Sequence, residues 1–315
     1  MSFSTVKKDG KEYVYYVADS SKRLYIGTPE KPNKDNVIKA LDLLKKRRDD
    51  YLEKLEEEEK KLISLLPTKT NETGNKPIFY ELVVFDLDGV LYQKPWYEID
   101  DDQVAVSTWD ILFQELGPTM YEMHNQLKDN YKKGMYGNGN YLEWTSKACK
   151  VLESCLTKKI FEEVINKRQL MSGAKELFEE LHKNNAKTAV ISGSFDALAQ
   201  RAAKDLGGID DIKAHCKLHF DSRGLLDSNE LEKTDYDDKV LEVKKLIKKY
   251  GFSKEKCAYI GDDVNDRPVF KEVGLAIAFN CKKPQVQEIA DVVIKSRDLR
   301  DIIPHLKFGP KKIKY

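Results

Sequence analysis

The sequence predicts an α/β fold built on a doubly wound, mostly parallel Rossmann-like sheet, and three observations support this prediction. Short apolar runs, typical of buried parallel strands, recur between residues 80 and 294. Amphipathic helix patterns separate several of these runs, as expected of βαβ units. The first run, at residues 80–85 (YELVVF), leads directly into acidic residues, as a strand does when it delivers a loop to a ligand site.

Residues 1–76 predict a separate N-terminal unit, made of a β-hairpin and a long helix. Residues 11–27 hold two aromatic and β-branched runs around a polar turn. From Asn36 to about Leu66, apolar residues recur at alternating spacings of four and three once Arg48 and Glu58 are counted in the stripe, with no interior Gly or Pro. Such a coiled-coil-like stripe needs a partner, so we predict a homodimer through this helix. The polar residues 68–76 then indicate a linker.

Composition and charge limit the class of protein. The 54 Lys and Arg against 53 Asp and Glu give a formal net charge of +1, which argues against a surface devoted to nucleic acid. Basic clusters at Lys22-Arg23 and at residues 45–48 still leave nucleic-acid or protein binding by the N-terminal unit as an alternative. No apolar run is long enough for a membrane span or a signal peptide, so we expect a cytoplasmic protein without membrane contact.

The α/β part is predicted to consist of a core and an inserted cap. The core comprises residues 77–90 and 188–315. Residues 91–187 follow the first strand and indicate helices and loops, a size and place suited to covering a site at the sheet edge. The predicted core strands lie at residues 80–85, 188–191, 257–260, 275–279 and 292–294, and helix patterns lie at residues 174–184 and 240–250.

Polar residues follow three of the predicted strands and one lysine begins a helix, and together they form the candidate site. Because the carboxyl ends of parallel strands meet at one crevice, these side chains are expected to lie close together. They are Asp86 and Asp88 after the first strand, Ser192 and Gly193 after the second, Lys239 at the start of the helix predicted at residues 240–250, and Asp262, Asn265 and Asp266 after a later strand.

This set of groups suits the transfer of a phosphoryl group. Clustered carboxylates repel one another unless a cation joins them, and ligation by a few oxygen atoms suits Mg²⁺. A hydroxyl, a backbone N–H, an ammonium and Mg²⁺ together neutralise the charge of a moving phosphoryl group. An aspartate can also attack phosphorus covalently.

Four ordered motifs carry a resemblance to a known family. They are FDLDGV at residues 85–90, VISGSFD at 190–196, Lys239, and GDDVND at 261–266. From about Phe79 to Lys307 the chain resembles the haloacid dehalogenase-like hydrolase superfamily, and within it the phosphoserine phosphatase-like branch. The resemblance implies a haloacid dehalogenase-like core with a helical cap inserted after its first strand.

The resemblance also implies a role for each motif residue. Asp86 would be the nucleophile that becomes an aspartyl-phosphate, and Asp88 the general acid and then the general base. The remaining implied roles are phosphate binding by Ser192, Gly193, Lys239 and Asn265, Mg²⁺ binding by Asp86, the Asp88 carbonyl and Asp262, and support of that site by Asp266. The implied activity is Mg²⁺-dependent hydrolysis of a phosphate monoester, with transfer to an acceptor alcohol as the alternative.

The substrate is left open, because the resemblance departs where phosphoserine is recognised. That branch uses a Glu shortly after the first motif and an Arg in the cap. Here the first position falls at residues 94–96 (KPW), and residues 140–152 contain no Arg. The insertion holds all three tryptophans and several tyrosines, which form either the core of the cap or an aromatic wall for a larger substrate.

Overall fold

In the computed structural model the chain forms two compact units, Met1–Gly74 and Asn75–Tyr315. The structure describes the strands of residues 2–32 by their backbone, and residues 78–99, 102–136 and 140–307 in the second unit. Side chains are described for residues 78–95, 106–136 and 140–307.

The first unit contains a four-stranded antiparallel sheet in the order β1-β2-β3-β4. The predicted hairpin is confirmed as β2 and β3, which pair with Tyr15 opposite Tyr25. The two outer strands, β1 and β4, were not predicted. The predicted helix at residues 36–66 lies outside the described residues, and the dimer that rests on it stays a prediction. The four strands are β1 (Ser2–Lys8), β2 (Lys11–Asp19), β3 (Lys22–Thr28) and β4 (Lys31–Pro32).

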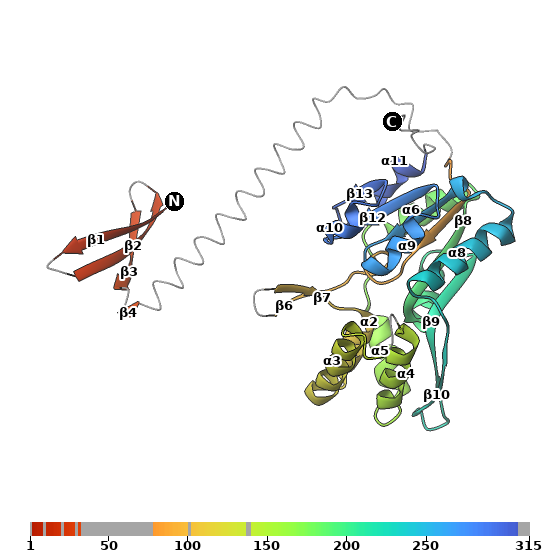
Figure 1. Cartoon of the computed structure of the whole chain (residues 1–315), viewed down its shortest axis with the longest axis horizontal. Helices are drawn as coiled ribbons and strands as arrows, with labels where there is room; N and C mark the ends of the chain where they lie inside the picture. Colours follow the sequence, from red (N-terminus) through yellow and green to blue (C-terminus); the bar gives the residue numbers. More distant parts are fainter. Residues whose placement is uncertain are drawn as a thin grey trace. The chain divides into compact units, whose positions relative to one another are not determined.

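A seven-stranded sheet forms the centre of the second unit, in the order β10-β9-β8-β5-β11-β12-β13 (Figure 1). All neighbours pair in parallel except β9 and β10, so the predicted mostly parallel sheet is confirmed. The strands are β5 (Leu82–Phe85), β8 (Lys187–Phe195), β9 (Asp211–Phe220), β10 (Leu226–Leu231), β11 (Cys257–Gly261), β12 (Leu275–Phe279) and β13 (Val292–Ile294).

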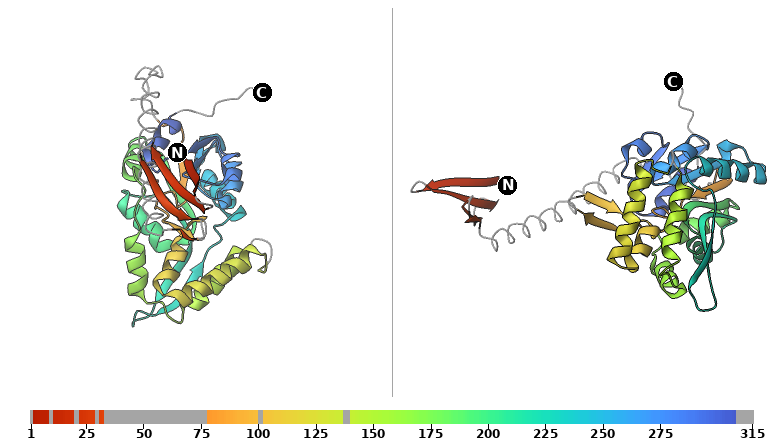
Figure 2. Two further views of the ribbon diagram at one scale, coloured as in Figure 1. Left: turned by 90° about the vertical axis from the view of Figure 1, so that its left-hand side faces the viewer. Right: turned by 60° about the horizontal axis from the view of Figure 1, so that its bottom comes forward.

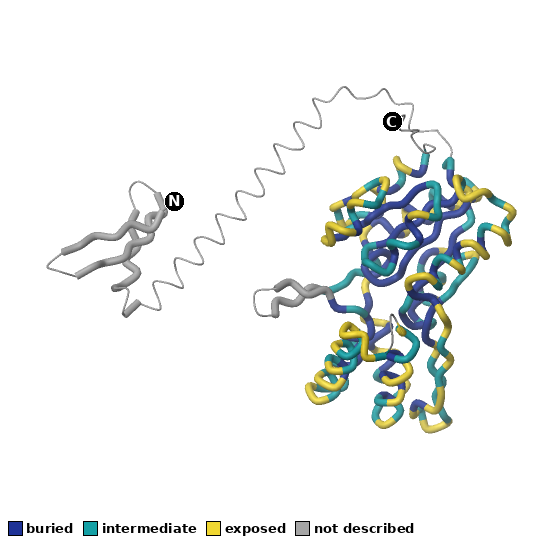
Figure 3. The backbone as a smooth tube through the Cα atoms, in the orientation of Figure 1, coloured by how far each residue is buried: buried dark blue, intermediate teal, exposed yellow. Residues whose placement is uncertain are grey.

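Helices cover both faces of this sheet, which makes the fold doubly wound. Along β5, Leu82 and Val84 join the apolar cluster of α8 and α9, while Val83 and Phe85 join that of α6 and α7. The ring of Phe178 on α6 lies 5.2 Å from that of Phe85. Figure 3 shows the buried strands between partly exposed helices. The helices of the core are α6 (Ala174–Lys183), α7 (Asp196–Asp205), α8 (Asp237–Tyr250), α9 (Arg267–Phe270), α10 (Pro284–Gln287) and α11 (Ile303–Leu306), with 3-10 turns at Lys254–Lys256, Val264–Asp266 and Leu299–Ile302.

The insertion after β5 forms the helical cap, except that the last helix of the predicted range 91–187, α6, packs on the core sheet. It contains α2 (Thr108–Glu115), α3 (Pro118–Lys132), α4 (Tyr141–Leu152) and α5 (Lys158–Lys167). Figures 1 and 2 show these helices gathered at one end of the sheet, with α4 beside the β9–β10 hairpin. Two short strands, β6 (Trp96–Ile99) and β7 (Asp102–Ala105), precede them. The sequence predicted only helices and loops here, because four-residue strands are too short to establish an alternating pattern.

Among the described residues, no helix combines the length and apolar character that crossing a membrane would require.

Candidate active site

The loop after β5 carries the first two acidic residues of the site, Asp86 and Asp88, and both are buried. This loop lies against the loop that carries Asp262. Gly89 has a φ of +90°, and a Cβ at this position would lie 2.2 Å from Asp262 Oδ2. Only glycine therefore permits this close approach of the two loops.

The end of β8 brings Ser192 and Gly193 to the same edge of the sheet. Ser192 is buried, and its carbonyl accepts a hydrogen bond from Thr234 Oγ1 at 2.9 Å. The Gly193 carbonyl accepts hydrogen bonds from Trp109 Nε1 at 3.1 Å and from the Tyr141 hydroxyl at 2.7 Å. Both donors belong to cap helices, so the cap is attached to the core directly at the predicted phosphate-binding segment.

Lys239 lies in the first turn of α8 and is fully buried. Its ammonium lies 3.2 Å from Asp86 Oδ1 and 2.7 Å from Asp266 Oδ1. The first contact is close enough for an ion pair, although its angle is not that of a hydrogen bond, while the second is a hydrogen bond. The carboxylates of Asp266 and Asp86 raise the pKa of Lys239 against the opposing effect of burial, so the ammonium stays charged.

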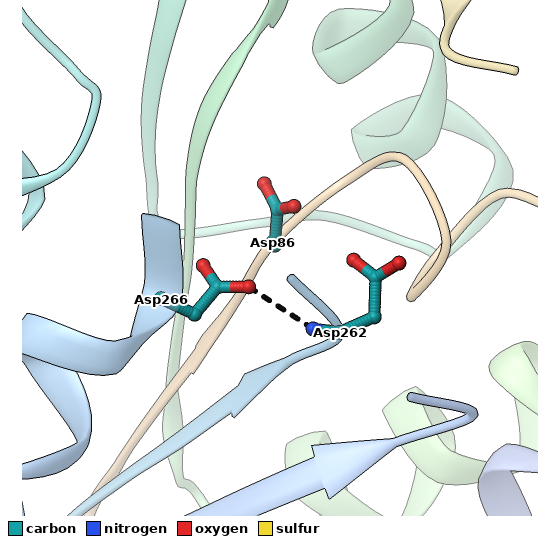
Figure 4. Close-up of side chains that lie close together, drawn as sticks. All are labelled: Asp86, Asp262 and Asp266. Atoms are coloured by element: carbon teal, nitrogen blue, oxygen red, sulfur yellow. Dashed lines mark hydrogen bonds between the residues drawn. The ribbon is translucent and has the colours of Figure 1, made fainter. Parts of the chain in front are cut away.

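Asp86, Asp262 and Asp266 form an acidic cluster in which one carboxylate oxygen of each lies within 4.8 Å of the others (Figure 4). The two oxygens of Asp266 are already engaged. One accepts from Lys239 and from the Tyr259 hydroxyl, and the other accepts from the backbone N–H of Asp262, as the dashed line in Figure 4 shows. Asp266 is therefore placed to hold the cluster together.

The remaining two carboxylates of the cluster have acceptor atoms to spare. Asp86 Oδ1 and Asp262 Oδ1 are buried and accept no hydrogen bond. Burial raises the pKa of Asp86, and burial together with the neighbouring acids raises the pKa of Asp262 to about 7. A buried carboxylate oxygen without a hydrogen-bond donor makes the charged form of the acid unfavourable. A cation held by Asp86 and Asp262 would stabilise the charged form of both acids.

The side chain of Asp88 faces the cap and not the acidic cluster. Its Oδ1 accepts from Thr108 Oγ1 at 2.6 Å and from Arg168 Nη2 at 3.0 Å, and Thr108 N lies 3.3 Å from Oδ2. Arg168 is buried and also donates to the Gln93 carbonyl at 2.7 Å. Asp88 thereby connects the loop after β5 to the first cap helix, α2, and to Arg168, which directly follows the last cap helix, α5.

Lys94 belongs to the segment after the first motif where the sequence resemblance departs, and its ammonium binds the acidic cluster. Lys94 Nζ donates to Asp262 Oδ2 at 2.7 Å and lies 3.9 Å from Asp263 Oδ2. Burial alone would lower the pKa of Lys94, but the carboxylates of Asp262, Asp263 and Asp86 raise it above its ordinary value. The charged Lys94 ammonium and any metal ion bound at this site would therefore both contact Asp262.

Asn265 lies in the 3-10 turn Val264–Asp266 after β11 and donates from Nδ2 to Asp235 Oδ1 at 2.7 Å. Its Oδ1 is buried without a hydrogen-bond partner. All eight residues of the predicted site are thus brought to one edge of the sheet. The sequence did not reveal Lys94, Thr108, Arg168, Tyr141 or Asp235 as parts of the site, because none of them belongs to a local motif.

Comparison with known proteins defines the class of this chain. A family model described as haloacid dehalogenase-like hydrolase matches residues 80–274. The chain therefore belongs to the haloacid dehalogenase-like hydrolase family and is an enzyme of the hydrolase class. The acidic loop after β5, the segment at the end of β8, the buried lysine and the acidic loop after β11 are the four motifs that predicted this membership.

Within that family the chain belongs to the phosphoserine phosphatase-like branch. It is 31% identical over 228 residues to the phosphoserine phosphatase of Methanocaldococcus jannaschii, a match covering 72% of this chain and 98% of that protein. It is 30% identical over 207 residues to that of Streptococcus thermophilus, covering 65% and 92%. A solved phospho-aspartyl intermediate analogue of phosphoserine phosphatase superposes with a TM-score of 0.57 at 28% identity, covering 72% of this chain and 98% of that one.

Proposed function

We propose that this enzyme hydrolyses phosphate monoesters through an aspartyl-phosphate on Asp86 and depends on Mg²⁺. The observation that carries the proposal is the environment of Asp86. Its carboxylate is buried, has an oxygen without a hydrogen-bond partner, and lies 3.2 Å from the fully buried ammonium of Lys239. A carboxylate beside a fixed cation can attack a phosphoryl group that the same cation binds.

In the first step, a carboxylate oxygen of Asp86 forms a bond to phosphorus and the bond from phosphorus to the leaving oxygen breaks. Asp88 gives its proton to the leaving oxygen. In the second step, Asp88 takes a proton from water, the water oxygen bonds to phosphorus, and the bond from phosphorus to Asp86 breaks. Phosphate is released and both aspartates return to their starting states.

The remaining residues bind and orient the phosphoryl group. Lys239 supplies a permanent positive charge, and Ser192 and the Gly193 backbone N–H lie at the end of β8 with hydrogen-bond donors for its oxygens. A Mg²⁺ held by Asp86, Asp262 and the Asp88 carbonyl would neutralise charge on the phosphoryl oxygens when bound. Asp266 would keep the metal-binding loop in place through the N–H of Asp262.

The proposal is tested by turnover of p-nitrophenyl phosphate, with free phosphate and any phosphorylated acceptor alcohol measured separately. Turnover should require added Mg²⁺ and stop with a chelator, and Asp86→Asn should abolish it. Asp263→Asn is the matched control, because Asp263 is the neighbouring acid that pairs with Lys283. Undiminished turnover by Asp86→Asn would refute the mechanism, and phosphorylated acceptor in place of phosphate would indicate a phosphotransferase.

A further inference from the structure

The pairing of β8 with β9 is interrupted at the predicted phosphate-binding segment. Gly193 and Ser194 of β8 lie between two register pairs, and β9 has only one residue in the same interval, so the two residues form a β-bulge. Bulges beside active sites change the direction of the backbone, and the polar groups left out of the ladder need other partners. The two register pairs are Ser192 with Ala214 and Phe195 with Cys216.

Two side chains of the cap supply partners for the Gly193 carbonyl in this bulge. Trp109 Nε1 of α2 donates to it at 3.1 Å, and the Tyr141 hydroxyl of α4 donates to it at 2.7 Å. Burial raises the pKa of Tyr141 well above its ordinary value, so the hydroxyl keeps the proton that it donates. The carbonyl is therefore held by two separate helices of the cap.

Glycine at position 193 makes this contact possible. A Cβ there would lie 2.8 Å from the Tyr141 hydroxyl oxygen and 3.1 Å from its Cζ, so a side chain would displace the tyrosine. Glycine also leaves its own backbone unrestricted, so the peptide groups beside it depend on hydrogen bonds for their orientation. The two donors are fixed by ring packing, since the ring of Trp109 lies 4.3 Å from that of Phe195, and the ring of Tyr141 lies 5.0 Å from that of Trp144.

The opposite side of the same peptide group contacts Ser192. The peptide between Gly193 and Ser194 is trans, so its carbonyl and its N–H point in opposite directions. This N–H, which belongs to Ser194, donates to the buried Ser192 Oγ at 3.3 Å. A hydroxyl oxygen that accepts a hydrogen bond still has its own proton to donate, and the proton rotates to suit the partners. The orientation of this peptide therefore affects the direction in which the Ser192 hydroxyl donates.

We propose that Trp109 and Tyr141 are positioning residues for the phosphoryl group. By holding the Gly193 carbonyl they orient the peptide that follows it, and through the Ser194 N–H they direct the Ser192 hydroxyl towards the phosphoryl oxygens. Both residues act through the backbone and need no contact with the substrate. The inference rests on the proposed phosphatase function, and it makes the affinity of the phosphate site depend on the packing of the cap against the core.

The experiment measures binding of inorganic phosphate to the Mg²⁺-loaded full chain by calorimetric titration. Tyr141→Phe, which removes only the hydroxyl, should weaken phosphate binding about fivefold, because one hydrogen bond to the Gly193 carbonyl is lost. Trp109→Phe should weaken it by a similar factor for the same reason. If Trp109→Phe fails to fold, Tyr141→Phe alone still decides the outcome.

Two matched controls repeat these substitutions where no hydrogen bond is lost. The Trp144 Nε1 and the Tyr80 hydroxyl are buried without a hydrogen-bond partner, so Trp144→Phe and Tyr80→Phe change only packing. Trp144 also packs against Tyr141, which makes its variant a stringent control. Each control should change phosphate affinity less than about twofold.

A second measurement separates positioning from a loss of packing. In a Ser192→Ala background the hydroxyl is absent, so Tyr141→Phe should weaken phosphate binding less than about twofold. An equal loss in both backgrounds would overturn the action through Ser192. A loss no larger than that of the controls would overturn the positioning role altogether.

Failure of this inference and failure of the proposed function give different results. Turnover of p-nitrophenyl phosphate, with phosphate binding that Tyr141→Phe leaves unchanged, would keep the phosphatase function and overturn the positioning role. Weaker phosphate binding in Tyr141→Phe, without turnover by the wild type, would support the positioning role and refute the proposed hydrolysis. A Mg²⁺-loaded wild type that binds no phosphate would overturn the positioning role whether or not it turns over esters.

Discussion

At the residue scale, the acids of the site differ in what faces them. Asp86 and Asp262 have buried oxygens without hydrogen-bond donors, whereas both oxygens of Asp266 are occupied by donors. Asp88 instead binds Thr108, the first residue of cap helix α2, and Arg168, which follows cap helix α5. Four carboxylates in one site therefore have different partners, which allows different roles.

The assignment of Asp88 as acid and base predicts a dependence on the leaving group. In Asp88→Asn, turnover of an alkyl phosphate should fall about 100-fold or more, because a poor leaving group needs the proton. With p-nitrophenyl phosphate the first step needs no acid, so a burst of about one nitrophenol per site should precede slow steady-state turnover. Rapid mixing measures the burst. Equal losses for both esters without a burst would contradict the assignment.

The contact between Lys94 and Asp262 predicts competition with the metal ion. Lys94→Met should tighten Mg²⁺ binding roughly tenfold, because removing an ammonium bound to a metal ligand removes repulsion of the incoming cation. Calorimetric titration with Mg²⁺ measures the affinity directly. Lys283→Met, which removes the partner of Asp263, is the control and should change the affinity less. Weaker binding in Lys94→Met would show that the lysine organises the site.

At the element scale, helix α4 of the cap packs against the β9–β10 hairpin of the core. The buried His215 of β9 joins the two, since its Nε2 lies 2.7 Å from Thr145 Oγ1 on α4 and its Nδ1 contacts the Glu232 carbonyl. The carbonyl can only accept, so Nδ1 carries the proton and Nε2 is the acceptor. Cys149 Sγ and Cys216 Sγ lie 3.8 Å apart at the same contact.

This histidine predicts a loss of stability on acidification. Burial lowers the pKa of His215 from 6.5 to about 4. Below pH 6.5 this histidine is protonated in the unfolded chain but stays neutral in the folded chain until about pH 4. The free energy of unfolding therefore falls as the pH falls through this window, and the effect levels off below it. From pH 7 to pH 5 the histidine should contribute a loss of about 2 kcal/mol.

Urea unfolding followed by tryptophan fluorescence measures this loss, because all three tryptophans lie in the insertion after β5. His215→Asn keeps a donor for the Glu232 carbonyl but has no proton to bind. The variant should therefore lose about 2 kcal/mol less stability than the wild type between pH 7 and pH 5. Equal losses in the two proteins would show that His215 already binds a proton in the folded state.

At the scale of the whole molecule, the chemistry and the predicted association lie in different units. Every predicted site residue falls within Asn75–Tyr315, and none falls within Met1–Gly74. The 72% of this chain that matches the Methanocaldococcus jannaschii protein covers 98% of that protein. The family model matches residues 80–274, which lie entirely within the second unit.

This division predicts that residues 1–76 are dispensable for turnover and required for self-association. Light scattering should show a dimer for the full chain and a monomer after deletion of Met1–Lys76, with turnover of p-nitrophenyl phosphate retained. Self-association is expected because the apolar stripe predicted between Asn36 and Leu66 would be exposed to water in a monomer. A monomeric full chain would contradict the dimer. Salt-sensitive nucleic-acid binding lost on deletion would favour a targeting role.

The sequence by itself determined the order of the core strands along the chain and the motifs at their ends. The run at residues 80–85 and the helix at residues 240–250 were predicted within a few residues, because burial on a sheet or helix imposes a local pattern. Asp86 and Asp262 were placed at one site for the same reason, since the carboxyl ends of parallel strands converge. Four strands of the second unit, β6, β7, β9 and β10, were not among the predicted strands, and β6 and β7 are too short to show an alternating pattern.

The tertiary structure alone decided which groups face these motif residues. Lys94 reaches Asp262 from 168 positions away, Arg168 reaches Asp88 from 80, and Asn265 reaches Asp235 from 30. Pairing across such separations depends on how the cap and the loops pack, so no local sequence pattern predicts it. The chemical class of the enzyme therefore follows from short motifs, whereas the charges that face the motif residues follow from contacts that only the folded chain makes.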